Sequence, residues 1–177
     1  MDDDQLHFSE FYRTEFATLV GFVMKAVGAT VYEGTDAAQA ALTEAWAKWG
    51  TLFNPRAWVR TVAIRAYYRS VPVREVSLDH HPEVLDLVAT DCPVELSERT
   101  AAAHALLELL PPAQRIVLAY STDGFSDAEI AAELGKSLEA VRQNRHRARK
   151  TLKSLLQTQS REVTHDDSAS RVPRRVG

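Results

Sequence analysis

The stretch from Arg142 to Lys153 carries side chains that are suited to binding a polyanion. It holds six Lys or Arg together with His146, and it contains no Asp or Glu. Arg can bond guanine bidentately and Gln can bond adenine in the same way, whereas Lys suits a phosphate as a point charge. We therefore predict a nucleic-acid-binding surface made of Arg142, Gln143, His146, Arg147, Arg149, Lys150 and Lys153.

A second basic stretch runs from Arg56 to Arg74 and holds five Arg and no acid. Tyr67 and Tyr68 lie among these arginines. Aromatic rings stack on unpaired bases while cations follow the backbone, so this pattern is suited to separated strands. For either tyrosine, packing in the core or at its edge is the alternative. The candidate residues are Arg56, Arg60, Arg65, Tyr67, Tyr68 and Arg69.

The order of charges along the chain favours this interpretation more than the net charge of −3 does. The first 55 residues hold eight acids against three bases, and residues 75–98 hold seven acids and no Lys or Arg. A single charged run is usually a solvated helix face. Two basic blocks separated by an acidic stretch can each neutralise several phosphates and release counterions.

Other kinds of chemistry have weak support. The triplet Asp79-His80-His81 also occurs in metal-dependent phosphoesterases, but such a site needs further ligands presented by a sheet, and no strands are predicted. Cys92 is the single cysteine, which excludes an intrachain disulfide and fits a reducing cytoplasm. The N-terminus lacks a signal-peptide layout, and no apolar run approaches the roughly 18 residues of a membrane span. We expect a cytoplasmic protein that is not an enzyme and has no metal, no cofactor and no membrane insertion.

Helices must position the basic stretches, because apolar residues recur at steps of three and four along most of the chain. In the N-terminal half, Asp36 with Gln39 matches the capping box that opens a helix, and Asn54 suits the N-cap of another. The predicted helices cover residues 6–27, 37–49 and 55–70. We expect them to share a small core that holds Trp46, Trp49 and Trp58.

Helical periodicity resumes after residue 97. Residues 73–97 contain Pro82 and Pro93 without a sustained period, which indicates an extended acidic linker. The polar tail over 157–177 is expected to be disordered. Further helices are predicted over 98–110, from Pro111-Pro112 onward, over 127–134 and over 138–156. The predicted fold is all-α, with an N-terminal helical bundle (1–72) and a C-terminal four-helix domain (98–156) whose basic surfaces are held apart by the linker.

The C-terminal domain contains the pattern of a helix-turn-helix. Ser126 with Glu129 matches a capping box, Gly135 suits the left-handed backbone that ends a helix, and Ser137 can cap the next helix. At 100° per residue, four apolar residues of the second helix fall within roughly 40° of one line, opposite the basic residues. These four residues are Val141, Ala148, Leu152 and Leu155. This layout enters the major groove of DNA, with a helical hairpin that has a solvated basic face as the alternative.

Two segments together resemble a known family. The segment LLELLPPAQRIVLAYSTDGFSDAEIAAELGKSLEAVRQNRHRARKTL resembles the promoter-binding domain of extracytoplasmic-function sigma factors, and it is also similar to other helix-turn-helix domains such as those of response regulators. The N-terminal segments TDAAQAALTEAWAKW and NPRAWVRTVAIRAYYRS resemble the N-terminal domain of the same sigma factors. The likeness covers roughly residues 6–156.

The resemblance implies a sigma factor that binds core RNA polymerase and promoter DNA. It implies that Asp36, Gln39 and Glu44 dock on the clamp helices of the polymerase and that the C-terminal domain meets its flap. It implies that residues 56–69 open the −10 element and hold a flipped base, and that the second helix of the helix-turn-helix reads the −35 element. The linker would thread the active-site cleft, and an anti-sigma factor is a further candidate partner.

The sequence departs from the family pattern at two positions, and one other regulator class remains as an alternative. Arg65 and Arg69 stand near positions where the family usually has Asn and Asp, so no base preference at the −10 element is predicted. A stand-alone helix-turn-helix regulator that binds an operator as a dimer would use the same C-terminal pattern. The N-terminal half shows no receiver-like alternation of strands and helices, which favours the sigma factor.

Overall fold

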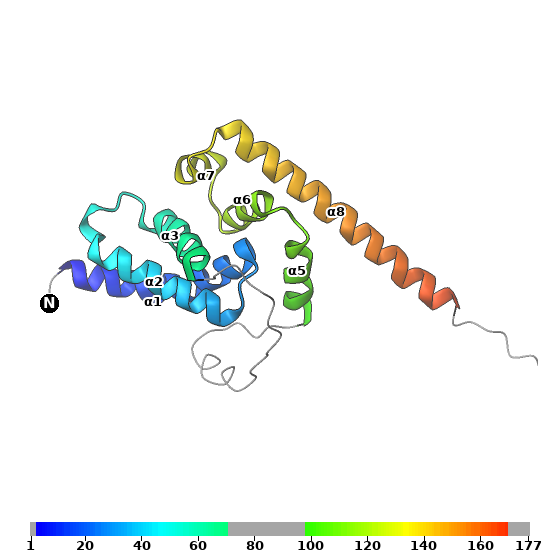
Figure 1. The fold of residues 1–177 in the computed structure, drawn as a ribbon, viewed down its shortest axis with the longest axis horizontal. Helices are drawn as coiled ribbons and strands as arrows, with labels where there is room; N and C mark the ends of the chain where they lie inside the picture. Colours follow the sequence, from blue (N-terminus) through cyan, green and yellow to red (C-terminus); the bar gives the residue numbers. More distant parts are fainter. Residues whose placement is uncertain (1–2, 71–97, 170–177) are drawn as a thin grey trace, which may run out of the picture.

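The computed structural model describes residues 3–70 and 98–169, and every regular element in these ranges is helical (Figure 1). The N-terminal elements are α1 (Asp3–Val27), α2 (Val31–Ala47), the short 3-10 helix η1 (Trp49–Thr51) and α3 (Pro55–Ser70). The C-terminal elements are α5 (Glu98–Glu108), α6 (Pro112–Thr122), α7 (Asp127–Leu134) and α8 (Leu138–Ala169). The predicted all-α class is confirmed. The Asp79-His80-His81 triplet lies outside the described residues.

Helix α2 begins six residues earlier than the sequence pattern predicted. Thr30 is its N-cap: the Thr30 hydroxyl accepts from the backbone N–H of Glu33 at 3.3 Å, and the Glu33 carboxylate accepts from the Thr30 N–H at 2.8 Å. The predicted capping box at Asp36 and Gln39 is therefore wrong. Gly34 lies inside α2, where an added Cβ would come within 3.3 Å of a backbone oxygen of α1. It lets the two helices approach closely.

The N-terminal core is aliphatic, with the tryptophans at its margin. Leu19, Val23, Leu42 and Val59 are almost completely buried among α1, α2 and α3. Trp46 is 47% exposed, while Trp49 and Trp58 are partly buried. The expectation that all three indole rings fill one core is wrong. Trp46 and Trp49 instead pack on Phe8 near the start of α1, with ring centroids 4.9 and 5.0 Å apart from that of Phe8.

The two halves of the chain pack against each other (Figure 1). Helix α1 lies against α6 and also meets α5, and α3 contacts α7. The Phe22 ring meets the Tyr120 ring edge-on at 4.8 Å, and the hydroxyls of Thr61 and Tyr120 are hydrogen-bonded at 2.8 Å. Burial raises the pKa of Tyr120 well above its ordinary value, so this hydroxyl stays protonated. The expectation that the two basic surfaces are held apart is therefore not what the structure shows.

Helix α8 continues well past the point where the sequence pattern ended it. It runs for 32 residues, about 48 Å at 1.5 Å per residue, and projects beyond α5 in Figure 1. The expectation of a disordered tail is wrong over residues 157–169. Each added residue extends an existing helix without a new nucleation cost, so a polar segment can continue it without an apolar period.

No single helix in the described ranges is long and apolar enough to cross a membrane. One bent pair, residues 4–27 with 31–47, passes on length and composition, with a bend of 119° between its members. The apolar faces of these two helices are buried in the N-terminal core.

Candidate nucleic-acid interface

The helix-turn-helix is built by three local devices that were predicted from the sequence. Ser126 caps α7, because its hydroxyl accepts from the backbone N–H of Glu129 while the Glu129 carboxylate accepts from the Ser126 N–H at 2.8 Å. These hydrogen bonds from Ser126 hold the pKa of Glu129 below its usual value. Gly135 ends α7 with φ of 60°, and the Ser137 hydroxyl caps α8 by accepting from the Ala140 N–H at 3.1 Å. The turn that aims α8 is therefore well defined.

Helix α8 has a buried line and a basic exposed side. Val141 and Ala148 are completely buried, and Leu152 and Leu155 are partly buried, as the helical period predicted. All seven candidate residues of this helix are exposed, namely Arg142, Gln143, His146, Arg147, Arg149, Lys150 and Lys153. The structure thus gathers them on one helix and leaves them accessible. Their role in binding DNA stays a prediction.

Acidic side chains orient part of this surface. The Asp127 carboxylate, in the first turn of α7, lies 2.7 Å from Arg145 Nη1 and 3.7 Å from Arg142 Nε. The shorter contact is poorly aligned for a hydrogen bond, so it is an ion pair. The Gln143 amide donates to Glu139 at 3.2 Å. Arg142 is thereby drawn toward α7, while no described ion pair involves Arg147 or Lys150.

The candidate residues of α3 are divided between surface and interior. Arg65, Tyr68 and Arg69 are exposed, and the Arg56 side chain is 46% exposed. Arg60 is 0% exposed and Tyr67 is 8% exposed, which differs from the expectation of one open surface. The physical reason is that α3 is covered on two sides, by α1 and α2 on one and by α7 on another.

Phe53 is an exposed aromatic residue that lies outside every motif predicted from the sequence. It precedes Asn54, whose side-chain oxygen accepts from the Ala57 N–H at 3.2 Å and so caps α3 as predicted. An apolar residue just before an N-cap often packs on the residue four positions into the helix, here Trp58. Phe53 is instead fully solvent-exposed. A large exposed apolar side chain next to a basic helix is a candidate for contact with a ligand.

The predicted polymerase-binding residues lie on α2. Asp36 and Gln39 are exposed, and Glu44 is partly exposed and forms an ion pair with Lys48 at 3.1 Å. The side chains are accessible on one helix, and nothing in the described residues pairs Asp36 with a cation. Their docking role stays a prediction.

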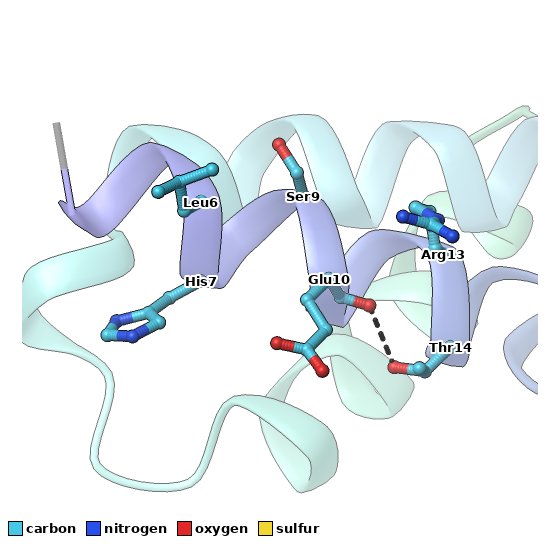
Figure 2. Close-up of a pocket in the computed structure, with 6 residues that line it drawn as sticks. All are labelled: Leu6, His7, Ser9, Glu10, Arg13 and Thr14. Atoms are coloured by element: carbon cyan, nitrogen blue, oxygen red, sulfur yellow. Dashed lines mark hydrogen bonds between the residues drawn. The ribbon is translucent and has the colours of Figure 1, made fainter. Parts of the chain in front are cut away.

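A surface hollow on α1 is lined by residues of that one helix, and within it the Thr14 hydroxyl donates to the backbone carbonyl of Glu10 at 3.0 Å (Figure 2). It contains none of the candidate residues. Within 3–70 and 98–169, no group of three or more His, Cys, Asp or Glu is placed to hold a metal ion.

Comparison with known proteins finds similarity in both halves of the chain. The model of the family described as "Sigma-70, region 4" matches residues 100–152, which include the whole helix-turn-helix. The chain is 35% identical over 139 residues to the ECF RNA polymerase sigma factor SigJ of Mycobacterium tuberculosis, covering 70% of this chain but only 43% of that protein. It is 28% identical over 160 residues to the RNA polymerase sigma-E factor of Streptomyces avermitilis, covering 86% and 87% of the two chains.

A solved structure shares the fold. The sigma factor RpoE of Bartonella quintana, in its co-crystal structure with the anti-sigma factor NepR, aligns with a TM-score of 0.63 and 23% identity, over 85% of this chain and 97% of that one. The alignment therefore extends over both halves. The fold is therefore shared with a solved sigma factor. In sequence, the chain is similar to sigma-70 region 4 over residues 100–152 and to two RNA polymerase sigma factors over most of its length.

Proposed function

We propose that the protein binds core RNA polymerase, recognises the −35 and −10 elements of promoters and promotes DNA melting for transcription initiation. The observation that carries this proposal is the exposed set of cationic side chains and one amide on α8, which follows the capped turn of the helix-turn-helix. The chain that carries this surface is similar to a sigma factor along most of its length. The protein itself supplies no reaction chemistry in this proposal. It positions the polymerase.

Helix α8 would read the −35 element in the major groove. Arg142, Gln143 and Arg147 have the side chains that bond purine edges bidentately, and Lys150 and Lys153 suit phosphates. The exposure of all five supports this assignment. The first turn of a recognition helix meets the bases, so residues nearer the N-terminus of α8 are better placed for base contacts.

Helix α3 would engage the −10 element as its strands separate. Unstacking a base costs a few kcal/mol, which a protein recovers through stacking and backbone contacts. Tyr68 is 52% exposed and lies beside exposed Arg65 and Arg69, which supports a stacking role for this ring. Phe53 provides a second exposed ring before the start of the helix. Tyr67 would have to leave the core to stack, so we assign it no direct contact.

The partners follow from the family. Asp36, Gln39 and Glu44 of α2 would dock on the clamp helices of core polymerase, and the C-terminal half would meet the flap. The solved relative from Bartonella quintana is bound to an anti-sigma factor. We include an anti-sigma factor among the candidate partners of this chain for that reason.

Reconstitution with core polymerase tests the proposal. The purified chain, added to core enzyme and a random promoter library, should yield run-off transcripts from an enriched pair of −35 and −10 sequences. Arg147→Glu should reduce this transcription by about tenfold or more, since one bidentate base contact is worth about 1–3 kcal/mol and the reversed charge also repels phosphate. Binding to core enzyme should be unchanged.

Arg13→Glu is the matched control, because Arg13 is exposed on α1, away from the proposed DNA surfaces. It applies the same charge reversal and should transcribe like the wild type. If the wild-type chain neither joins core enzyme nor redirects initiation, the proposed function is refuted. Tight operator binding by the free chain, with no effect on polymerase, would instead favour the stand-alone regulator.

A further inference from the structure

The turn between α6 and α7 docks on the N-terminal half through one buried carboxylate. The side chain of Asp123 is 3% exposed. It accepts a hydrogen bond from Lys25 Nζ at 2.7 Å and another from Arg60 Nε at 2.9 Å. The backbone oxygen of the same residue accepts from Arg56 Nη2 at 3.0 Å. Three cations from α1 and α3 therefore converge on a single residue of the other half.

The guanidinium of Arg60 is completely buried at this contact. Its Nη1 donates to Glu15 at 3.0 Å, and its Nη2 lies 2.8 Å from the Asp123 carboxylate but out of line for a hydrogen bond, so that contact is an ion pair. The guanidinium carbon lies 5.4 Å from the ring centre of Phe22 and 5.1 Å from that of Phe125. A buried cation must be paired, and here one of its two carboxylates comes from the C-terminal half.

Removing the C-terminal half would change the charge of this surface. The N-terminal half alone would present Lys25, Arg56 and Arg60 against the single carboxylate of Glu15. Asp123, which belongs to the C-terminal half, is thus the second anion that pairs with these three cations. Arg56 and Arg60, two of the arginines that the sequence predicted for the −10 element, are bound to it in this arrangement.

The packed arrangement also conflicts with occupying both promoter elements at once. Helix α3 contacts α7, and α7 contacts α8, so the two proposed DNA-binding helices belong to one compact body (Figure 1). The −35 and −10 elements lie about 25 base pairs apart, which is roughly 85 Å along B-DNA at ~3.4 Å per base pair. The halves must separate before α8 and α3 can reach both elements.

We propose that the Asp123 contact is an autoinhibitory contact: it holds the free protein closed, and it opens when the polymerase and promoter engage the two halves. This inference rests on the proposed function. If only a fraction of the free molecules is open, the apparent dissociation constant for forming the promoter complex equals the intrinsic constant divided by that fraction.

Distance measurements on the free chain test the contact directly. Spin labels on Thr18→Cys and Ala113→Cys, both exposed, in a Cys92→Ser background report the separation of α1 and α6, which pack against each other, by pulsed electron resonance. The chain with native Asp123 should give one narrow, short distance, which should become long on adding core polymerase and promoter DNA. Asp123→Asn, with nearly the same shape but no charge, should give a longer and broader distribution in the free chain.

Asp127→Asn is the matched control, since Asp127 is also paired with arginines but only within the C-terminal half. It should keep the short distance. A long distance in the free chain with native Asp123, or an unchanged short distance in a helical Asp123→Asn chain, would overturn the proposal. Should Asp123→Asn lose its helical circular dichroism, Lys25→Gln removes one of the same bonds, and it too must lengthen the distance.

Transcription separates this inference from the proposed function. At limiting protein, Asp123→Asn should reach half-maximal transcription at about tenfold lower concentration than the wild type. If Asp123→Asn is open by the distance measurement but still needs the wild-type concentration for half-maximal transcription, autoinhibition is refuted. If neither chain directs transcription, the proposed function fails, while the distances still decide whether Asp123 closes the molecule.

Discussion

Tyr67 and Tyr68 show how neighbouring residues of one type acquire different roles. Successive residues on a helix point about 100° apart, so a helix packed on two sides exposes only one of such a pair. Tyr68 is 52% exposed, whereas Tyr67 belongs to the buried core. Their rings lie 5.4 Å apart, edge to face. The sequence offered both as stacking candidates, and burial separates them.

We predict that Tyr68→Ala impairs strand opening by roughly tenfold, because stacking on one base is worth about 1–3 kcal/mol. The measurement is permanganate reactivity of thymines in the melted region, compared with closed-complex binding, which should change little. Tyr68→Phe keeps the ring and should restore opening. Wild-type reactivity in the alanine variant would exclude a stacking role for this residue.

Arg60 marks the limit of what residue type and spacing can predict. The arginines of α8 were expected to be exposed and are exposed. Arg60 has the same residue type in a similar basic run, yet it is completely buried. What distinguishes it is Asp123, which is 63 residues away in the sequence and becomes its partner only when the halves pack. No local pattern carries that information.

At the scale of the element, a capping box in the sequence predicted the start of a helix correctly where only one such pattern was present. Ser126 with Glu129 starts α7 as predicted. Near α2 the sequence offers the pattern at Thr30 with Glu33 and again at Asp36 with Gln39, and the first is used. The helix that starts at the first pattern includes Gly34, and a glycine inside a helix is unfavourable by its intrinsic propensity. Its advantage is the close approach of α2 to α1, which depends on tertiary packing and is not visible in the local sequence.

We predict that Ser126→Ala lowers the free energy of unfolding by about 1 kcal/mol, the usual cost of removing a serine N-cap. The measurement is urea denaturation followed by circular dichroism. Ser9→Ala is the control, because the hydroxyl of Ser9 donates only to the Gln5 carbonyl within α1. That change should have a much smaller effect. Equal losses in both variants would show that the Ser126 cap makes no special contribution.

The pH dependence of the cap has a definite sign. The pKa of Glu129 is lowered by its hydrogen bonds to Ser126, so its contribution to stability is present above the unfolded-state pKa and is lost as the pH falls through the folded-state value. Ser126→Ala removes one of these bonds. The difference between wild type and variant should therefore shrink in acid.

At the scale of the whole molecule, the sequence predicted the helices but not how the two sets pack. Phe22 lies on α1 in the N-terminal half, whereas Val117 and Tyr120 lie on α6 in the C-terminal half. In the structure they belong to one continuous buried cluster. An apolar residue that faces a neighbouring domain has the same helical period as one that faces its own. The arrangement of the halves, and hence the closed state proposed above, could be derived only from the structure.

The distribution of charge over the whole molecule leads to a final prediction. With a net charge of −3, the protein should bind DNA only through a localised surface. For the complex with core polymerase, the logarithm of promoter affinity should fall linearly with the logarithm of salt concentration. Lys153→Gln should reduce the steepness by about one unit and weaken all promoters alike, because it removes one phosphate contact. Arg13→Gln removes the same charge from α1 and should leave the slope unchanged. If both variants reduce it equally, overall charge rather than the α8 surface determines binding.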